Sequence, residues 1–164
     1  ECLIPLIDKN EDTSIKLATE EHSTAIWEWR NDETARAMSL NQDFISWENH
    51  QNWYERILIN KNRHIYVGYI EEILFGMVRF DKCKDLDNAY EVSINLDPLR
   101  RGKGLGKLLL AEAVEEFWRR VSDANLILAE IKKENKASEK LFESVGFQKQ
   151  QVTTTLYKFS LCRV

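Results

Sequence analysis

The chain has 164 residues, of which 43% are hydrophobic and 30% are charged, and its formal net charge is −4. This composition is that of a folded domain with a sizeable core, and the acidic balance argues against a general nucleic-acid-binding protein. The sequence contains no apolar run long enough to cross a membrane and no recognisable signal peptide, so we expect a cytoplasmic protein with no membrane or nucleic-acid partner.

Three cysteines, Cys2, Cys83 and Cys162, lie far apart and lack metal-binding spacing. We therefore expect free or buried thiols in a reducing compartment and no bound metal, with a disulfide between the two chain ends as the alternative. The first residue is Glu rather than Met, which suggests a chain trimmed or cut from a longer one. Residues 1–13 are expected to be a tail or linker remnant, and residues 14–164 a single domain.

The N-terminal third predicts a short strand at 15–18 followed by helices. Thr19 is a suitable N-cap for a helix that Asn31-Asp32 should interrupt, and a short helical piece is expected from Glu33. A longer helix is predicted at 46–59, because its aromatic and aliphatic residues recur at helical spacing.

Three antiparallel strands are predicted next. Residues 64–70 and 73–80 are joined by the tight turn Glu71-Glu72, and residues 90–96 follow a polar loop. The last of these strands alternates apolar residues with Glu91, Ser93 and Asn95, which should share one face.

A basic, glycine-rich turn follows this strand. Pro98 should end the strand, and three glycines, at 102, 104 and 106, let the backbone approach a ligand closely. Residues 99–107 contain four cations and no acid, immediately before a helix predicted at 105–121. Free amides at a helix N-terminus together with local positive charge form an anion site that suits pyrophosphate.

The C-terminal part predicts a strand at 126–131, a helix at 136–145 and a last strand at 153–161. The first of these strands returns after a helix, so it should pair in parallel. Gly146 fits a helix C-cap, and we expect Ala137, Leu141 and Phe142 to face inward. The whole pattern indicates an α+β fold, with a mixed central sheet that is antiparallel at first and then has a parallel crossover, and with helices on both faces.

Two familiar glycine motifs do not fit the turn. A Walker A loop would need Ser or Thr after Lys107 and Gly at Arg101, and a GxGxxG fingerprint would need Gly at Lys107 or Leu109. The pattern Arg-x-x-Gly-x-Gly at 101–106 fits instead, and it resembles the acetyl-CoA site of the GNAT superfamily of N-acetyltransferases. Asn135, followed by the segment from Lys140 to Phe147, resembles a second motif of that family, and the order of elements from about residue 15 onward is that of the GNAT fold.

The resemblance implies acetyl-CoA as the cofactor. Its pyrophosphate would lie over the glycine turn, and its pantetheine arm beside the edge of a central strand that splays from its neighbour and offers backbone groups. The residues implied in cofactor binding are Ile94, Asn95, Leu96, Arg101, Gly102, Lys103, Gly104, Leu105, Gly106, Lys107 and Asn135. Asn135 also suits the N-cap of the helix that follows it.

For catalysis we expect Glu91 to be the general base, with Ser93 on the same face to orient a water. A solvated strand residue is the alternative interpretation of Glu91. Phe142 stands where many members of the family have a Tyr that is proposed to protonate the thiolate, so the general acid is open, with Tyr90 or Tyr157 as candidates.

The resemblance places the acceptor amine against the N-terminal helices. The segment Trp29-Arg30-Asn31 and the helix predicted at 46–59 resemble two subgroups of the family. One acts on ribosomal-protein N-termini, and the other, which is the closer match, acts on UDP-linked amino sugars. Arg30 or Arg36 would pair with a diphosphate, and aromatic rings would stack on the nucleotide. The candidate substrate-binding residues are Trp29, Arg30, Asn31, Arg36 and His50, although packing in the core is the usual role of such tryptophans and histidines.

The sequence therefore predicts an N-acetyltransferase that acts on the amino group of a UDP-linked amino sugar, as a monomer or homodimer. A protein N-terminus is the alternative acceptor, and a non-catalytic acyl-CoA-binding module is the alternative class. A fusion behind a UDP-sugar hydrolase is a further hypothesis for the trimmed N-terminus.

Overall fold

The computed structural model describes residues 12–164. Seven strands form one mixed sheet in the order β1-β2-β3-β4-β5-β7-β6, in which β4 and β5 are parallel and every other neighbouring pair is antiparallel. The strands are β1 (Thr13–Leu17), β2 (Arg63–Ile70), β3 (Ile73–Lys82), β4 (Ala89–Leu96), β5 (Leu126–Lys132), β6 (Gln148–Gln151) and β7 (Leu156–Cys162). The predicted α+β architecture is confirmed.

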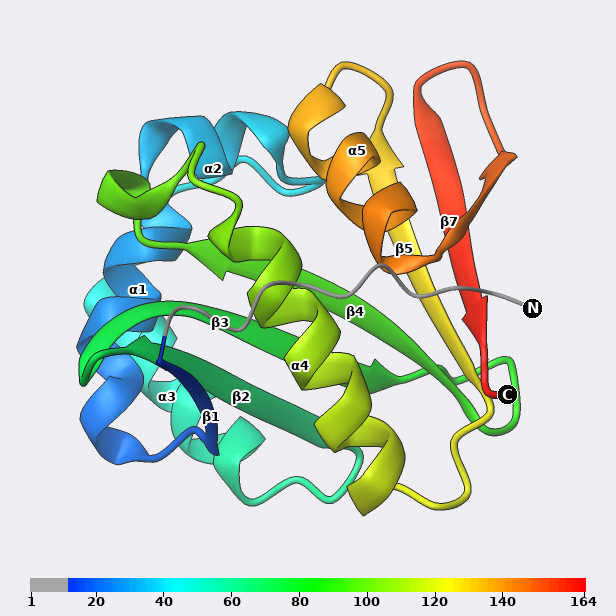
Figure 1. Ribbon diagram of the computed structural model, residues 1–164. Coiled ribbons are helices and arrows are strands. Elements are labelled where there is room, and N and C mark those ends of the chain that lie inside the picture. Colours follow the sequence, from blue (N-terminus) through cyan, green and yellow to red (C-terminus); the bar gives the residue numbers. More distant parts are fainter. Residues whose placement is uncertain (1–11) are drawn as a thin grey trace.

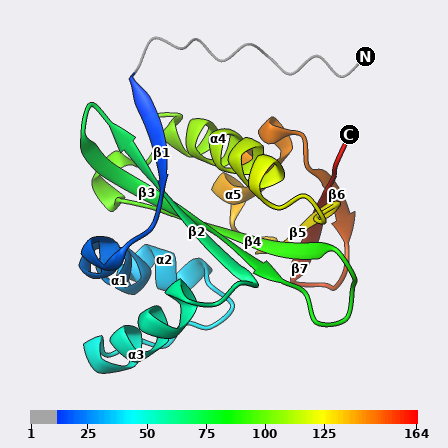
Figure 2. The same cartoon turned by 90° about the horizontal axis from the view of Figure 1, so that it is seen from below.

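Helices cover both faces of the sheet (Figure 2). On one side lie α4 (Leu105–Arg120) and α5 (Lys136–Val145), and on the other lie α1 (Ser23–Asn31), α2 (Glu33–Met38) and α3 (Trp47–Leu58). Two 3-10 turns, η1 (Glu20–His22) and η2 (Pro98–Arg100), precede α1 and α4. No helix within residues 12–164 has the length and apolar content that a bilayer crossing needs.

Local chemistry explains most element boundaries. The Thr19 amide donates to His22 Nδ1 (2.9 Å) ahead of α1, and the Ser46 hydroxyl accepts from the Asn49 amide (3.2 Å) to cap α3. Glu71 and Glu72 adopt positive φ angles of 46° and 70°, as a two-residue hairpin requires. Gly146 ends α5 in the left-handed conformation, with φ 102°.

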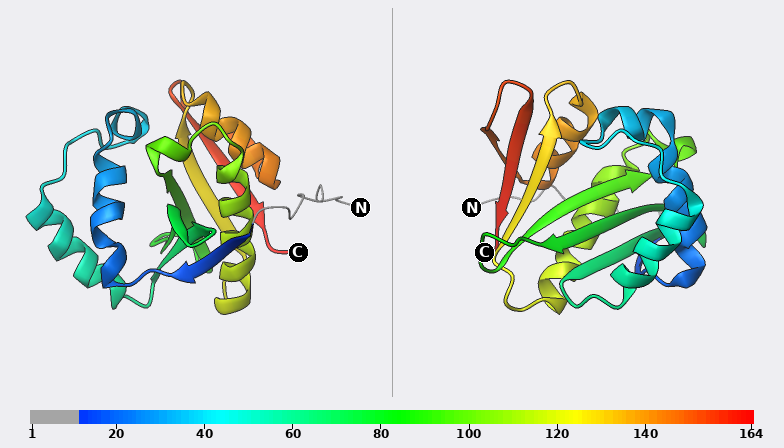
Figure 3. Two further views of the ribbon diagram at one scale, coloured as in Figure 1. Left: turned by 60° about the vertical axis from the view of Figure 1, so that its left-hand side comes forward. Right: turned by 180° about the vertical axis from the view of Figure 1, so that it is seen from behind.

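The core has two parts, one on each side of the sheet. Beneath α4 the rings of Phe80 and Phe117 stack with centroids 4.1 Å apart, and beneath α1 and α3 the buried residues include Ile26 and Tyr54. Helices α1–α3 cover only the β2–β4 half of their face and leave β5 and β7 bare (Figure 3). An open border therefore runs along β4 and β5 on that face.

Some boundaries differ from the prediction. Strand β1 begins at Thr13 and β7 at Leu156, and an additional strand, β6, precedes β7. Its sequence, Gln-Lys-Gln-Gln, has no apolar alternation and all four residues are exposed, so periodicity carried no signal for it. Ala137 is exposed rather than directed inward. Cys83 and Cys162 are free thiols, whereas Cys2 lies outside the described residues.

Candidate active site

The sheet opens between β4 and β5. Strand β4 pairs with β3 along its length, but its pairing with β5 covers only the registers from Ala89↔Leu126 to Glu91↔Leu128. Beyond Glu91 the two strands diverge, as Figure 1 shows. The backbone groups of residues 92–96 that face β5 are therefore available to a ligand, which agrees with the expected splay.

A cavity of about 540 Å³ lies in this opening, beside the glycine turn. Its walls come from α2, the end of β4, the turn and α5. Nine of the eleven residues expected to bind the cofactor line it: Ile94, Asn95, Leu96, Arg101, Gly102, Gly104, Gly106, Lys107 and Asn135. Lys103 and Leu105 are not in the lining; Leu105 is buried in the core beneath α4.

The glycine turn is open toward this cavity. Gly102 and Gly104 have φ angles of 74° and 76°, which L-residues rarely adopt, and a Cβ at either position would meet no atom within 4 Å. Helix α4 begins at Leu105 with Gly104 as its N-cap, without a side-chain cap and without an acid in its first turn. The first amides of this 16-residue helix are thus available for an anion, and the residues fit the pyrophosphate of a CoA ester.

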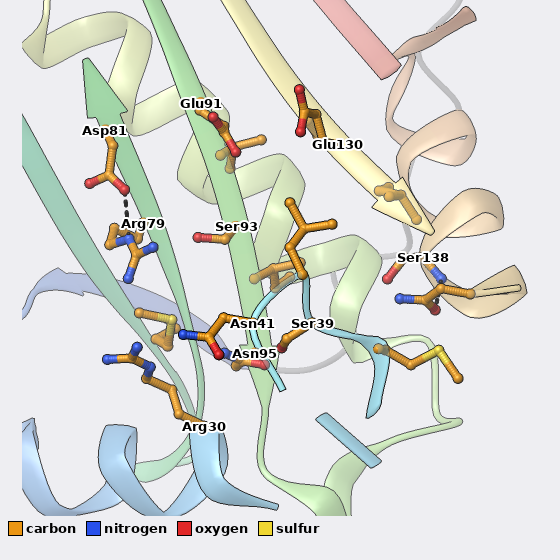
Figure 4. A pocket seen from close by; sticks show the side chains of 18 of the residues that line it. Arg30, Ser39, Asn41, Arg79, Asp81, Glu91, Ser93, Asn95, Glu130 and Ser138 are labelled. Carbon is orange, nitrogen blue, oxygen red and sulfur yellow. Dashed lines mark hydrogen bonds and ion pairs between the residues drawn. The ribbon is translucent and has the colours of Figure 1, made fainter. Parts of the chain in front are cut away.

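A second cavity, of about 290 Å³, lies on the bare border of the other face (Figure 4). Its charged lining residues come from α1, from the loop before α3 and from three neighbouring strands: Arg30, Asp43, Arg79, Asp81, Glu91 and Glu130. Six residues line both cavities, namely Met38, Ser39, Ile94, Asn95, Asn135 and Ser138. The two cavities therefore meet where β4 leaves β5, and a thioester in one would face an amine in the other.

Glu91 lies in the second cavity with electrostatics suited to a base. Glu91 is an exposed residue of β4, and partial desolvation raises the pKa of its carboxyl. The negative charges of Glu130 and Asp81 raise this pKa further, while Arg79 and Lys158 oppose the shift. Asp81 is opposite Glu91 in the β3–β4 register, and Glu130 projects from β5 on the same side. A carboxylate with a raised pKa accepts a proton more readily than an ordinary one, as a general base requires.

Replacing Glu130 by Gln is expected to shift the acidic limb of the kcat/KM profile to lower pH. Glu130 is the largest charge that raises the Glu91 pKa, so its removal lowers that pKa, and the ionised base persists at lower pH. The measurement is a pH–rate profile of the variant beside one of Glu134→Gln, which removes an exposed carboxylate that does not act on Glu91. An unshifted limb in Glu130→Gln would contradict Glu91 as the titrating base.

The other two residues expected to be catalytic, Ser93 and Tyr90, lie on opposite faces of the sheet. Ser93 lies two positions after Glu91 and lines the same cavity. Tyr90 projects to the opposite face, where it is buried, and its ring contacts Phe117 edge-on with centroids 4.9 Å apart. Because β-strand side chains alternate, Tyr90 and Glu91 cannot serve one site, and Tyr90 lines neither cavity.

Of the residues expected to bind the acceptor, Arg30 alone lines the second cavity. Its guanidinium lies over the Trp53 ring at 4.5 Å, and it has no ion-pair partner among residues 12–164. Burial and the charge of Arg79 lower the pKa of Arg30 to about 10, so the group stays cationic at neutral pH. An unpaired, half-buried cation in a cavity wall is suited to an anionic group of the acceptor.

The remaining four support the site from outside it. Asn31 holds the loop before α3 by bonds to both the amide and the carbonyl of Ile45, each 2.8 Å. Arg36 Nε donates to the Gln42 carbonyl (3.2 Å) of the same loop. Trp29 and His50 are buried, and His50 Nε2 lies 2.9 Å from the Ser23 carbonyl. The packing interpretation therefore describes Trp29 and His50 better than a binding role.

Among the polar residues of the second cavity that the sequence did not suggest are Arg79, Asp81, Glu130 and Ser138. The first two share a face of β3 by alternation, so their pairing with each other, at 2.9 Å, was detectable. Their approach to Glu91 depends on strand register, which alternation alone does not fix. Ser138 lies one helical turn before Phe142 and its amide donates to the Asn135 side chain (3.2 Å), so Asn135 caps α5 and lines both cavities.

The comparisons with known proteins agree with this geometry. The profile described as the acetyltransferase (GNAT) family matches residues 20–147, more than half of the chain. A curated relative, the L-methionine sulfoximine/L-methionine sulfone acetyltransferase of Salmonella typhimurium, is 30% identical over 134 residues, covering 77% of this chain and 66% of the relative, just under two thirds of its length.

Solved structures share the fold. That of yncA, a putative acetyltransferase from Salmonella typhimurium with its cofactor acetyl-CoA, has 25% identity and a TM-score of 0.77 over 92% of this chain and 94% of that one. The spermidine N-acetyltransferase of Vibrio cholerae, in complex with CoA and spermine, has 14% identity and a TM-score of 0.81 over 92% and 95%. The N-acetyltransferase PseH of Campylobacter jejuni has 16% identity and a TM-score of 0.69 over 93% and 99%, a likeness of fold.

Proposed function

The chain belongs to the acetyltransferase (GNAT) family, and we propose that it transfers the acetyl group of acetyl-CoA to the primary amine of a small acceptor that also carries an anionic group. The observation that carries this proposal is the meeting of two cavities at the β4–β5 split, with the glycine turn on one side and Glu91 on the other. When bound, acetyl-CoA supplies an acyl group activated as a thioester.

The chain's own groups would hold that donor along the first cavity. The free amides at the start of α4, with Lys107 beside them, suit the diphosphate. The backbone groups that β4 directs toward β5 between Ile94 and Leu96 have no strand partner there and suit the amides of the pantetheine arm, and a backbone N–H among them would polarise a carbonyl. Asn135 adds a side-chain amide at the junction of the cavities.

Glu91 would take the proton from the acceptor's ammonium group. An amine is a nucleophile only after it loses this proton, and the raised pKa of Glu91 matches the carboxylate to that task. Ser93 lies on the same strand face and would orient a water between base and amine, should the two not touch directly. The negative charges of Asp81 and Glu130 also favour the approach of a cationic ammonium group.

We further propose that Ser138 donates a hydrogen bond to the leaving group. It stands one turn before Phe142 on α5, and it lines both cavities, whereas Phe142 has no proton to give. Ser138→Ala is expected to lower kcat about tenfold, the value of one hydrogen bond to a developing charge. Ser144→Ala, on the same helix but lining the cofactor cavity alone, is the control. An unchanged kcat in Ser138→Ala would contradict this hydrogen bond.

Arg30 and Arg79 support an anion on the acceptor. Both guanidiniums lie over Trp53, at 4.5 Å and 5.2 Å, but Arg79 is paired with Asp81 while Arg30 is not. A nucleotide-linked amino sugar, the acceptor expected from the sequence, would offer its diphosphate. However, Phe142 is the one aromatic residue among the described residues that line the acceptor cavity. The aromatic surface expected to stack on the nucleobase is therefore not part of this cavity.

An amino acid is the second candidate, since its α-carboxylate lies beside its amine. The name of the curated relative, an acetyltransferase of two methionine derivatives, favours it, and so does a cavity of about 290 Å³. Polyamines and aminoglycosides carry amines but no anion, and a protein N-terminus carries none next to its amine. The proposal thus favours acceptors with an anionic group near the amine over acceptors that carry only amines.

The test is a thiol-release assay with acetyl-CoA against UDP-amino sugars, L-amino acids, polyamines, aminoglycosides and N-terminal peptides. We expect turnover with one or both of the anionic classes and the highest kcat/KM there. Efficient turnover of polyamines or aminoglycosides alone would overturn the acceptor assignment, and no thiol release with any amine would overturn the enzyme assignment.

A further inference from the structure

Helix α2 forms a wall of both cavities. Thr34, Ala35, Met38 and Ser39 line the cofactor cavity, and the last two also line the acceptor cavity. None of the six residues of α2 is buried. A segment without fully buried side chains gains limited stability from packing, so polar contacts contribute much to holding it in position.

Two such contacts reach α2 from across the cofactor cavity. Asp32, which precedes the helix, forms an ion pair with Arg101 of the glycine turn, with Oδ2 and Nη1 2.8 Å apart. The Lys132 ammonium at the end of β5 donates to the Ala37 carbonyl at 3.0 Å. Figures 1 and 3 show α2 beside the loop that follows β4, although 69 residues separate Asp32 from Arg101.

We propose that Asp32 is a positioning residue for the cofactor site: its ion pair with Arg101 fastens α2 to the glycine turn and so keeps the shared wall of the two cavities in place. The proposal rests on the proposed function in taking that cavity as the CoA site. It assigns Arg101 a structural tie to α2 rather than the role of a free phosphate ligand.

The geometry supports a specific bond rather than a chance surface contact. The two side chains are 23% and 32% exposed, for Asp32 and Arg101 respectively, so solvent screens the pair only in part. Hydrogen bonds from Arg101 and from the amides of Ala35 and Thr34 lower the pKa of the Asp32 carboxyl despite its partial burial, and it is ionised at neutral pH. The same carboxylate therefore caps α2, through the Ala35 amide at 3.0 Å, and ties it down.

Asp32→Asn separates these two roles, because Asn retains the N-cap acceptor and loses the charge. We expect its CoA affinity, measured by calorimetric titration, to be about threefold to tenfold weaker, the range for one charge-assisted hydrogen bond that is partly screened. Glu33→Gln is the matched control: it removes one negative charge at the next residue, which has no ion pair among the described residues, and should leave the affinity unchanged.

Tighter CoA binding in Asp32→Asn would overturn the proposal. If Asp32 merely withheld Arg101 from the diphosphate, Asp32→Asn would free a cation and tighten CoA binding. Unchanged affinity in Asp32→Asn would overturn it equally. A double-mutant cycle completes the test: in an Arg101→Gln background, Asp32→Asn should have no further effect, whereas additive losses would show that the two residues act separately.

Hydrogen exchange without any ligand distinguishes failure of this inference from failure of the proposed function. The amides of Arg36 and Ser39 bond within the α2 segment, and both should exchange faster in Asp32→Asn than in Glu33→Gln. If the protein bound no CoA but these amides still lost protection, the tie would stand and the cofactor assignment would fall. Equal exchange rates in the two variants would show that the ion pair does not hold α2 in place.

Discussion

Replacing Glu91 by Gln is expected to lower kcat about 10²- to 10⁴-fold, the contribution of a positioned general base, with little change in CoA affinity. Gln is of similar size and keeps a polar group in the cavity, but it cannot accept the ammonium proton. Since Glu91 lines the acceptor cavity and not the cofactor cavity, the donor should bind as before. The measurements are steady-state thiol release and a CoA titration on the same preparation.

Glu130→Gln is the matched control for this experiment. It makes the same chemical change on the neighbouring strand within the same cavity, and it should retain most of kcat at neutral pH. Loss of CoA binding in Glu91→Gln would indicate a structural role for Glu91. If the unaltered protein bound CoA without turnover of any amine, the non-catalytic acyl-CoA-binding module would be the correct class.

Features with local causes were predictable from the sequence. The order of the helices and of most strands follows from side-chain periodicity, and the left-handed Gly146 and the Glu71-Glu72 turn follow from short-range backbone preferences. The glycine turn between β4 and α4 was found for the same reason, since its residues are consecutive. Nine of the eleven expected cofactor residues lie within one cavity because most of them belong to this single stretch.

The acceptor side was harder because its residues come from distant segments. Arg30, Arg79, Glu91 and Glu130 belong to one helix and three strands, and only the packing of α1 on the sheet and the strand register bring them together. The same limit explains why Trp29 and His50, which share helices with polar residues, could not be assigned to core or site. Tyr90 is a different case, since alternation from Glu91 already places it on the other face.

Replacing Arg30 by Gln should raise KM for an anionic acceptor and lower its kcat/KM by about 10- to 100-fold, because a hydrogen bond between charged groups contributes about 1.5–3 kcal/mol. Arg30 lacks an ion-pair partner among residues 12–164, so its removal leaves no carboxylate of the chain unpaired.

A poor acceptor without an anion, such as a simple alkylamine, serves as the control on the substrate side, since its kcat/KM should stay nearly constant or rise as a cation leaves the cavity. Arg56→Gln, an exposed change on α3, controls for the loss of charge in general. Equal losses for both acceptors would mean that Arg30 supports the cavity through its contact with Trp53, and the anion requirement would then be wrong. A loss confined to the anionic acceptor would make charge, rather than size, the property by which this site selects its amine.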